Sequence, residues 1–145
     1  ESQNASLRPE CAASRLRGSP LHTARGMLSH EFCLVPRGDT PSSGRLYAAL
    51  ACRCVPLLIA NRFAEHFAFP TRGRYDEWVV SVPEGEFMRS PRASIEGAIH
   101  QARPQLTRIR SAMEAAGVEL LYDAAGSRAA DNMLRDWSAS CATGG

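Results

Sequence analysis

The residues best suited to bind a ligand lie in one polar segment that begins at Arg37 and ends at Arg45. Between these two arginines stand Gly38, Asp39, Thr40, Ser42 and Ser43. The segment leads into a run with helical spacing, and the first turn of a helix offers free N–H groups and a partial positive charge. Hydroxyl donors and guanidinium groups beside those N–H groups suit a phosphate. The segment is therefore a candidate anion-binding loop; the alternative is a capped helix with solvated arginines.

An apolar run on each side of this loop predicts a buried strand. The first run is Phe32–Val35, and the second, Val55–Ile59, is β-branched and apolar. A strand–helix–strand unit this short should be a right-handed crossover between parallel strands. Ligands of such folds lie beyond the carboxyl ends of the strands, where the loop that begins the helix is placed.

The helix between these strands is predicted from the spacing of Leu46, Ala49 and Leu50. Thr40 is the expected N-cap, with Pro41 at the first helical position, where a missing N–H costs nothing. Arg45 then lies in or just after the first turn, an unfavourable place for a cation unless an anion lies nearby.

A third strand is predicted at Trp78–Val82, ended by Pro83. Glu84 follows it in a predicted turn, at a position where a carboxylate can hydrogen-bond ribose or sugar hydroxyls. Glu86 is interpreted as part of a solvated turn. The loop that starts at Asn61 also leaves the carboxyl end of a strand and faces the same crevice. Its Glu65–His66 pair is an acid–base candidate, although a single loop His is more often structural.

The remaining elements are predicted to be helices. They are a short helix at Thr23–Ser29, a helix at Ser94–Gln101, a helix from Pro104 to about Ala116 ended by Gly117, and a last helix at Ala124–Trp137. The predicted organisation is a poorly ordered lead-in at 1–22, a folded domain at 23–117, and a C-terminal helix with a loose tail at 118–145. The fold class is α/β, a Rossmann-like parallel sheet with flanking helices.

Composition limits the classes of function. The 145 residues suffice for one domain, and a net charge of +2 gives no case for nucleic acid or an anionic membrane surface. Among the five cysteines, Cys33 and Cys54 are interpreted as small core residues, and no zinc or other metal site is expected. The sequence has no apolar run long enough to cross a membrane. Its first residue is Glu and not Met, so a fragment or a processed piece is expected.

The loop and its flanks resemble the exostosin family of glycosyltransferases. The resemblance rests on the string Phe-Cys-Leu-Val-Pro-Arg-Gly-Asp-Thr-Pro-Ser-Ser-x-Arg-Leu from Phe32, and on Cys54-Val55-Pro56. It continues through Asn61-Arg62-Phe63, Phe67-Ala68-Phe69 and the segment from Trp78 to Glu84, and covers roughly residues 27 to 110.

The resemblance implies the C-terminal, donor-binding half of a GT-B fold. It also implies a nucleotide-sugar donor, expected to be a UDP-sugar, and transfer with inversion onto a growing polysaccharide, glycoprotein or proteoglycan glycan in the Golgi. Ser42, Ser43, Arg45 and the helix N-terminus would stabilise the leaving diphosphate, with Arg37 in support. This scheme needs no metal or cofactor, and the catalytic base is not identified. Family members usually carry a membrane anchor and a second domain.

Two residues depart from the family pattern. Ala48 replaces an acidic residue that typically holds the ribose hydroxyls, and Arg53 replaces a small residue, which is expected to break the close turn into the second strand. These departures favour an alternative, a non-catalytic remnant or fragment that keeps the fold. A further alternative, an unrelated Rossmann-like phosphate binder, is disfavoured because no glycine fingerprint is present.

Overall fold

The computed structural model describes residues 20–142 except 40, 42 and 68, and these residues form an α/β fold. Its strands are β1 (Phe32–Pro36), β2 (Val55–Ile59) and β3 (Val80–Val82). Its α-helices are α2 (Pro20–Ser29), α3 (Gly44–Cys52), α4 (Pro70–Gly73), α5 (Tyr75–Trp78), α6 (Glu84–Arg89), α7 (Pro91–Ala102), α8 (Leu106–Leu120) and α9 (Ala129–Ala142). Two 3₁₀ turns, Phe63–His66 and Arg103–Gln105, complete the described elements.

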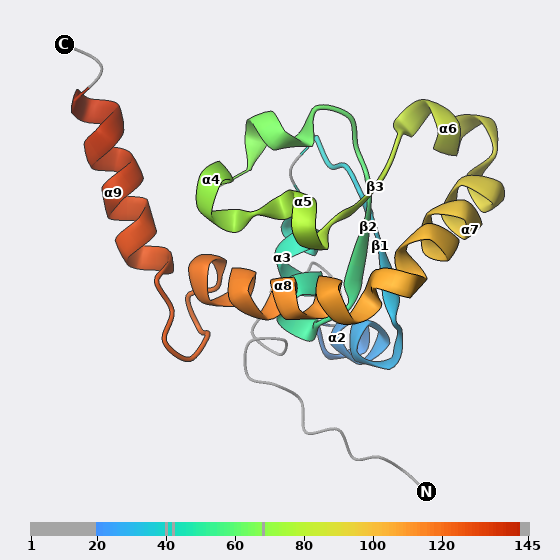
Figure 1. Cartoon of the computed structure of the whole chain (residues 1–145), viewed down its shortest axis with the longest axis horizontal. Coiled ribbons are helices and arrows are strands. Elements are labelled where there is room, and N and C mark those ends of the chain that lie inside the picture. The colour runs from blue at the N-terminus through green and yellow to red at the C-terminus, as the bar shows by residue number, and fades with distance from the viewer. Residues whose placement is uncertain (1–19, 40, 42, 68, 143–145) are drawn as a thin grey trace, which may run out of the picture.

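The sheet is parallel, as predicted, with the strand order β1–β2–β3. All five residues of the central strand β2 are buried, which explains its unbroken apolar sequence. Helix α3 provides the crossover from β1 to β2, and α2 packs against α3. Helices α6 and α7 lie beside β3, while α9 projects from the far end of α8 on the opposite side (Figure 1).

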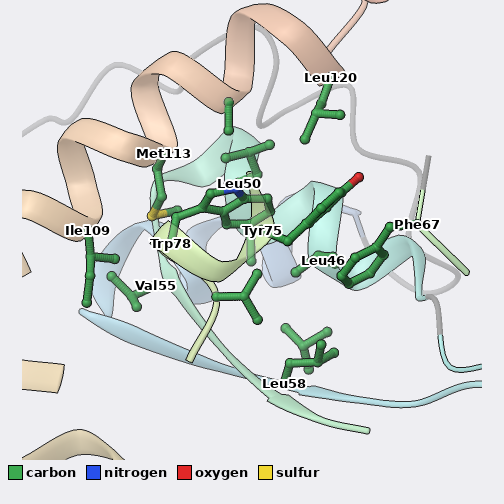
Figure 2. Close-up of a cluster of buried hydrophobic side chains, with 14 of the residues drawn as sticks. Leu46, Leu50, Val55, Leu58, Phe67, Tyr75, Trp78, Ile109, Met113 and Leu120 are labelled. Atoms are coloured by element: carbon green, nitrogen blue, oxygen red, sulfur yellow. The ribbon is translucent and has the colours of Figure 1, made fainter. Parts of the chain in front are cut away.

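The main core lies between the sheet and α8 (Figure 2). Large apolar side chains from β2, α3, α5 and α8 fill it, and they include Leu46, Leu50, Val55, Leu58, Trp78, Ile109 and Met113. The Trp78 indole is 1% exposed, and its Nε1–H donates a hydrogen bond of 2.7 Å to the carbonyl oxygen of Gly73. Only glycine fits at position 73, because an added Cβ would lie 2.4 Å from the Tyr75 ring. Helices α4 and α5 both pack against α8.

The two ends of α3 differ from the sequence-based expectation. The N-cap is Ser43, whose Oγ accepts a hydrogen bond from the Arg45 N–H, and the helix begins at Gly44, so Pro41 is not its first residue. The expected N-cap, Thr40, lies outside the described residues. At the other end Arg53 adopts the left-handed conformation (φ 57°), and the next N–H, that of Cys54, bonds the Ala49 carbonyl.

Arg53 therefore does not break the turn into β2, contrary to the prediction. Its left-handed backbone closes the end of α3, and β2 begins two residues later. Its side chain pairs with Glu114 of α8 at 2.6 Å. A left-handed conformation costs an L-residue about 1–2 kcal/mol, which glycine would not incur.

Cys33 and Cys54 form a disulfide and are not free core residues, which corrects the prediction. Their Cα atoms are 5.7 Å apart, because the pairing of Phe32 with Val55 brings the start of β1 beside the residue before β2. Cys52 is also disulfide-bonded, whereas Cys141 is free and exposed.

Several other boundaries are corrected. Trp78 ends helix α5, so the third strand is only Val80–Val82, and Glu84 begins helix α6 where a turn was expected. Gly117 lies inside α8, which continues to Leu120 because the buried side of the helix continues past the glycine. The last helix begins at Ala129, five residues later than predicted.

Tyr75 is the buried ionisable group of the core. Its ring stacks on Phe67 with centroids 3.8 Å apart, and its hydroxyl lies 3.3 Å from the hydroxyl of Tyr47. Burial, and then the Tyr47 hydrogen bond, raises the pKa of Tyr75 well above its usual value. The phenol therefore stays neutral while the chain is folded.

Within the described part of the chain, no helix has both the length and the apolar character needed to cross a bilayer.

Replacing both cysteines, Cys33→Ala with Cys54→Ala, should lower the free energy of unfolding by about 3 kcal/mol, because the disulfide closes a loop across a sequence separation of 21. Urea denaturation under non-reducing conditions measures this change. Cys141→Ala, at the exposed free thiol, is the matched control and should leave stability unchanged. A double variant as stable as the wild type would contradict the prediction.

Arg53→Gly should be more stable than Arg53→Ala by about 1 kcal/mol, since only glycine removes the left-handed strain. Both variants lose the Glu114 ion pair, so their difference isolates the backbone. Chemical denaturation of the two proteins in parallel measures it, and equal stabilities would show that position 53 carries no strain.

Tyr75 should make the fold sensitive to alkaline pH. The pKa of Tyr75 is raised in the folded protein, whereas the phenol ionises near pH 10 in the unfolded chain. The neutral Tyr75 therefore stabilises the fold fully below about pH 10. Above that pH, the free energy of unfolding falls by about 1.4 kcal/mol per pH unit. The stability advantage of the wild type over Tyr75→Phe should therefore shrink between pH 9 and 11. The same dependence on pH in both proteins would contradict the prediction.

Candidate functional site

The carboxyl ends of the three strands form one row. The register pairs the last residues of the strands with one another, namely Pro36, Ile59 and Val82. Arg37 follows β1 directly, Asn61 lies two residues beyond β2, and Glu84 lies two residues beyond β3. This is the edge at which parallel α/β sheets bind their ligands.

Asn61 and Glu84 hold each other by reciprocal hydrogen bonds. The Asn61 backbone N–H donates to Oε1 of Glu84 at 2.8 Å, and the Glu84 backbone N–H donates to Oδ1 of Asn61 at 3.3 Å. These bonds join the ends of β2 and β3 and fix the direction of the Glu84 carboxylate.

Arg37 joins this pair from the end of β1. Its Nη1 lies 3.6 Å from Oε1 of Glu84, and its backbone N–H donates to the Ile59 carbonyl at 3.0 Å. The Arg37 side chain is 46% exposed and that of Glu84 27%. The structure thus brings together two of the predicted site residues, Arg37 and Glu84, as a solvent-accessible ion pair.

The β1–α3 loop contains the other predicted residues. Gly38 accepts a 3.4 Å hydrogen bond from Nε of Arg37 through its carbonyl, and Asp39 is exposed. Ser43 caps α3, and Arg45 is exposed at the second position of the helix. The two remaining candidates, Thr40 and Ser42, lie outside the described residues.

The β1–α3 loop and Glu84 carry two charges of each sign, positive on Arg37 and Arg45 and negative on Asp39 and Glu84. Glu84 faces Arg37, whereas Arg45 has no carboxylate partner within the described residues. The N–H groups at the start of α3 add to the positive potential beside Arg45. An anion is therefore favoured near the start of α3 more than near β3.

Ala48 faces the interior. It is 1% exposed and packs in a small cluster with Ala24 and Met27 of α2 and with Cys52 and Cys54. A carboxylate at this position would be buried among apolar side chains unless α2 moved. The small residue is thus matched to the packing of α2 on α3.

In the loop after β2, Glu65 of the predicted acid–base pair is engaged by Arg62. Arg62 binds Glu65 through both oxygens, at 3.0 and 2.9 Å, and this hydrogen bonding lowers the pKa of Glu65. His66 is exposed. Phe67 is buried, and its ring stacks on Tyr75.

Asn61 is the residue that sequence reasoning did not include in the site. The sequence predicts that Asn61 begins a loop that faces the crevice, but no sequence pattern marks the Asn61 side chain as a partner of Glu84. The sequence signal for this pairing is position, because Asn61 and Glu84 each stand two residues beyond the last residue of a strand.

Comparison with known proteins places this edge in a family context. Residues 2–99 match the model of the exostosin GT47 domain. The probable arabinosyltransferase ARAD1 of Arabidopsis thaliana is 46% identical over 37 residues, which are 26% of this chain and 8% of that protein. The similarity to this relative thus spans a small part of its length. No solved structure matches the chain significantly.

The family match covers more than half of the 145 residues, and it includes the loop from Arg37 to Arg45, Asn61 and Glu84. The parallel three-stranded sheet with flanking helices agrees with the predicted Rossmann-like α/β fold class. The chain belongs to the exostosin GT47 family of glycosyltransferases.

Proposed function

We propose that this chain is the nucleotide-sugar-binding part of a glycosyltransferase, in the donor-binding half of a GT-B fold. The observation that carries the proposal is the meeting of Arg37, Asn61 and Glu84 at the aligned carboxyl ends of three parallel strands. Beside them begins a capped helix whose second residue, Arg45, has no carboxylate partner among the described residues.

The diphosphate of the donor is assigned to the start of α3. The N–H groups of Arg45 and Leu46 already bond Ser43, so the donors are the Ser43 hydroxyl and the Arg45 guanidinium, and the positive end of the α3 dipole adds to the positive charge. Arg37 approaches from the β1 side. Thr40 and Ser42 stay predicted contributors from the same loop.

The ribose or sugar hydroxyls are assigned to the Glu84 side of the site. A carboxylate accepts hydrogen bonds from hydroxyl groups but repels phosphate, so the donor would lie with its diphosphate toward α3 and its hydroxyls toward β3. Glu84 is already oriented by Asn61, which lowers the cost of ordering it when the ligand binds.

The proposed reaction is a single displacement with inversion. An acceptor hydroxyl oxygen forms a bond to C1 of the donor sugar while the bond from C1 to the diphosphate oxygen breaks. The electron pair leaves with the nucleoside diphosphate, whose charge Arg45, Arg37 and the α3 N-terminus stabilise. The hydroxyl proton passes to a base that we do not assign to a residue of this chain.

The acceptor is proposed to be a growing polysaccharide, glycoprotein or proteoglycan glycan, and the compartment the Golgi. The Cys33–Cys54 disulfide supports an oxidising lumen, because cytosolic proteins rarely keep such bonds. UDP-arabinose is the first donor to test, since one relative is named a probable arabinosyltransferase.

An alternative is a non-catalytic member of the family that keeps the fold. Buried Ala48 favours it, because an acidic residue that would hold the ribose is replaced by one that packs α2 against α3. Donor binding separates the two functions, since a non-catalytic remnant has no need of Arg45.

The test is calorimetric titration of the chain with uridine diphosphate. The wild type should bind saturably, and Arg45→Ala and Arg37→Ala should each weaken binding about 10- to 100-fold, the effect of losing a charge-assisted hydrogen bond. Arg92→Ala is the matched control, because Arg92 pairs with Glu96 on an exposed face of α7, and it should bind like the wild type.

Absence of binding by a wild-type chain that unfolds cooperatively would reject donor binding by this chain and favour the non-catalytic alternative. Equal weakening by Arg92→Ala would show that the effect is one of net charge and not of this loop.

A further inference from the structure

We propose that Asn61 is a ligand-contacting residue, and that its side-chain amide and the Glu84 carboxylate together bind two neighbouring hydroxyl groups of the nucleotide sugar. This inference rests on the proposed function and adds a residue and a ligand chemistry to that site. It follows from which atoms of the Asn61–Glu84 pair are used within the protein and which are not.

The hydrogen bonds fix how the Asn61 amide is turned. Oδ1 must face the Glu84 backbone N–H, from which it accepts at 3.3 Å, because the amide nitrogen has no lone pair to offer. Nδ2 is therefore turned the other way with two N–H donors. Within the described part of the chain these donors have no partner, and Asn61 is exposed.

Within the described residues, only one oxygen of the Glu84 carboxylate has a partner. Oε1 accepts from the Asn61 backbone N–H at 2.8 Å and lies 3.6 Å from Nη1 of Arg37. Oε2 has no partner among the described residues, and 27% of the side chain is exposed. The same pair of residues thus offers a ligand one acceptor, Oε2, and two donors, on Nδ2.

A site that offers both donors and an acceptor suits hydroxyl groups. Each hydroxyl both donates and accepts, so two adjacent hydroxyls can donate to Oε2 and accept from Nδ2 at once. A phosphate offers acceptors only and would be repelled by the carboxylate. The subsite therefore selects a neutral diol, which a nucleotide sugar carries both on its ribose and on its sugar.

The test combines removal of the ligand hydroxyls with removal of the amide. Uridine diphosphate, 2′,3′-dideoxyuridine diphosphate and UDP-arabinose are titrated calorimetrically into the wild type and into Asn61→Ala. If the ribose diol is bound, the wild type should prefer uridine diphosphate to its dideoxy analogue by about tenfold, and Asn61→Ala should lose most of that preference. If the sugar diol is bound, Asn61→Ala should instead lose a preference for UDP-arabinose over uridine diphosphate.

Asn61→Asp provides a readout that a purely structural role would not produce. The substitution keeps an acceptor for the Glu84 N–H but replaces the two donors with a second carboxylate. At pH 7.5 the diol-bearing ligand should bind at least about tenfold more weakly than to the wild type.

Glu65→Gln is the matched control, because Glu65 lies in the same loop but pairs with Arg62 away from the strand ends. It should bind all three ligands like the wild type. Loss of binding that is equal for all ligands in Asn61→Ala, or no loss at all, would overturn the inference and leave the proposed function standing. A wild type that binds none of the ligands would overturn the proposed function and this inference together.

Discussion

The parallel pairing of β2 with both of its neighbours is the constraint on which the rest of the structure depends. The strand is buried along its whole length, so a slip in register would expose apolar residues and move polar ones inward. The same register aligns the carboxyl ends of all three strands and thereby places Arg37, Asn61 and Glu84 at one edge. The site is a consequence of how β2 is buried.

The sequence was sufficient for the features that arise from local pattern and general topology. Apolar runs predict β1 and β2, their short separation predicts the parallel crossover, and the rule for strand ends then selects Arg37 and Glu84 as neighbours. Asn61 was harder to identify, because its partner stands 23 residues away and the pairing exists only after β3 has joined the sheet.

The errors share a physical origin, because each concerns a choice between chemically equivalent options. Several residues of one loop can cap a helix, and only the path of the backbone selects Ser43. Gly117 has the chemistry of a helix end but lies within α8, since burial of Leu120 favours another turn. Cys33 meets Cys54 only in the observed register. Arg53 shows that a nonglycine residue can occupy the left-handed position.

The distribution of charge explains how one small site can accept both an anion and hydroxyl groups. Glu84 and Arg37 largely compensate each other at 3.6 Å, so the edge near β3 presents polar atoms with little net charge. Arg45 and the first turn of α3 have no such compensation among the described residues, so the positive potential is concentrated there. If Glu84 were free to swing toward α3, it would cancel this potential. The hydrogen bond from the Asn61 backbone N–H to Oε1 of Glu84 opposes that movement and so keeps the anionic and the neutral parts of the site apart.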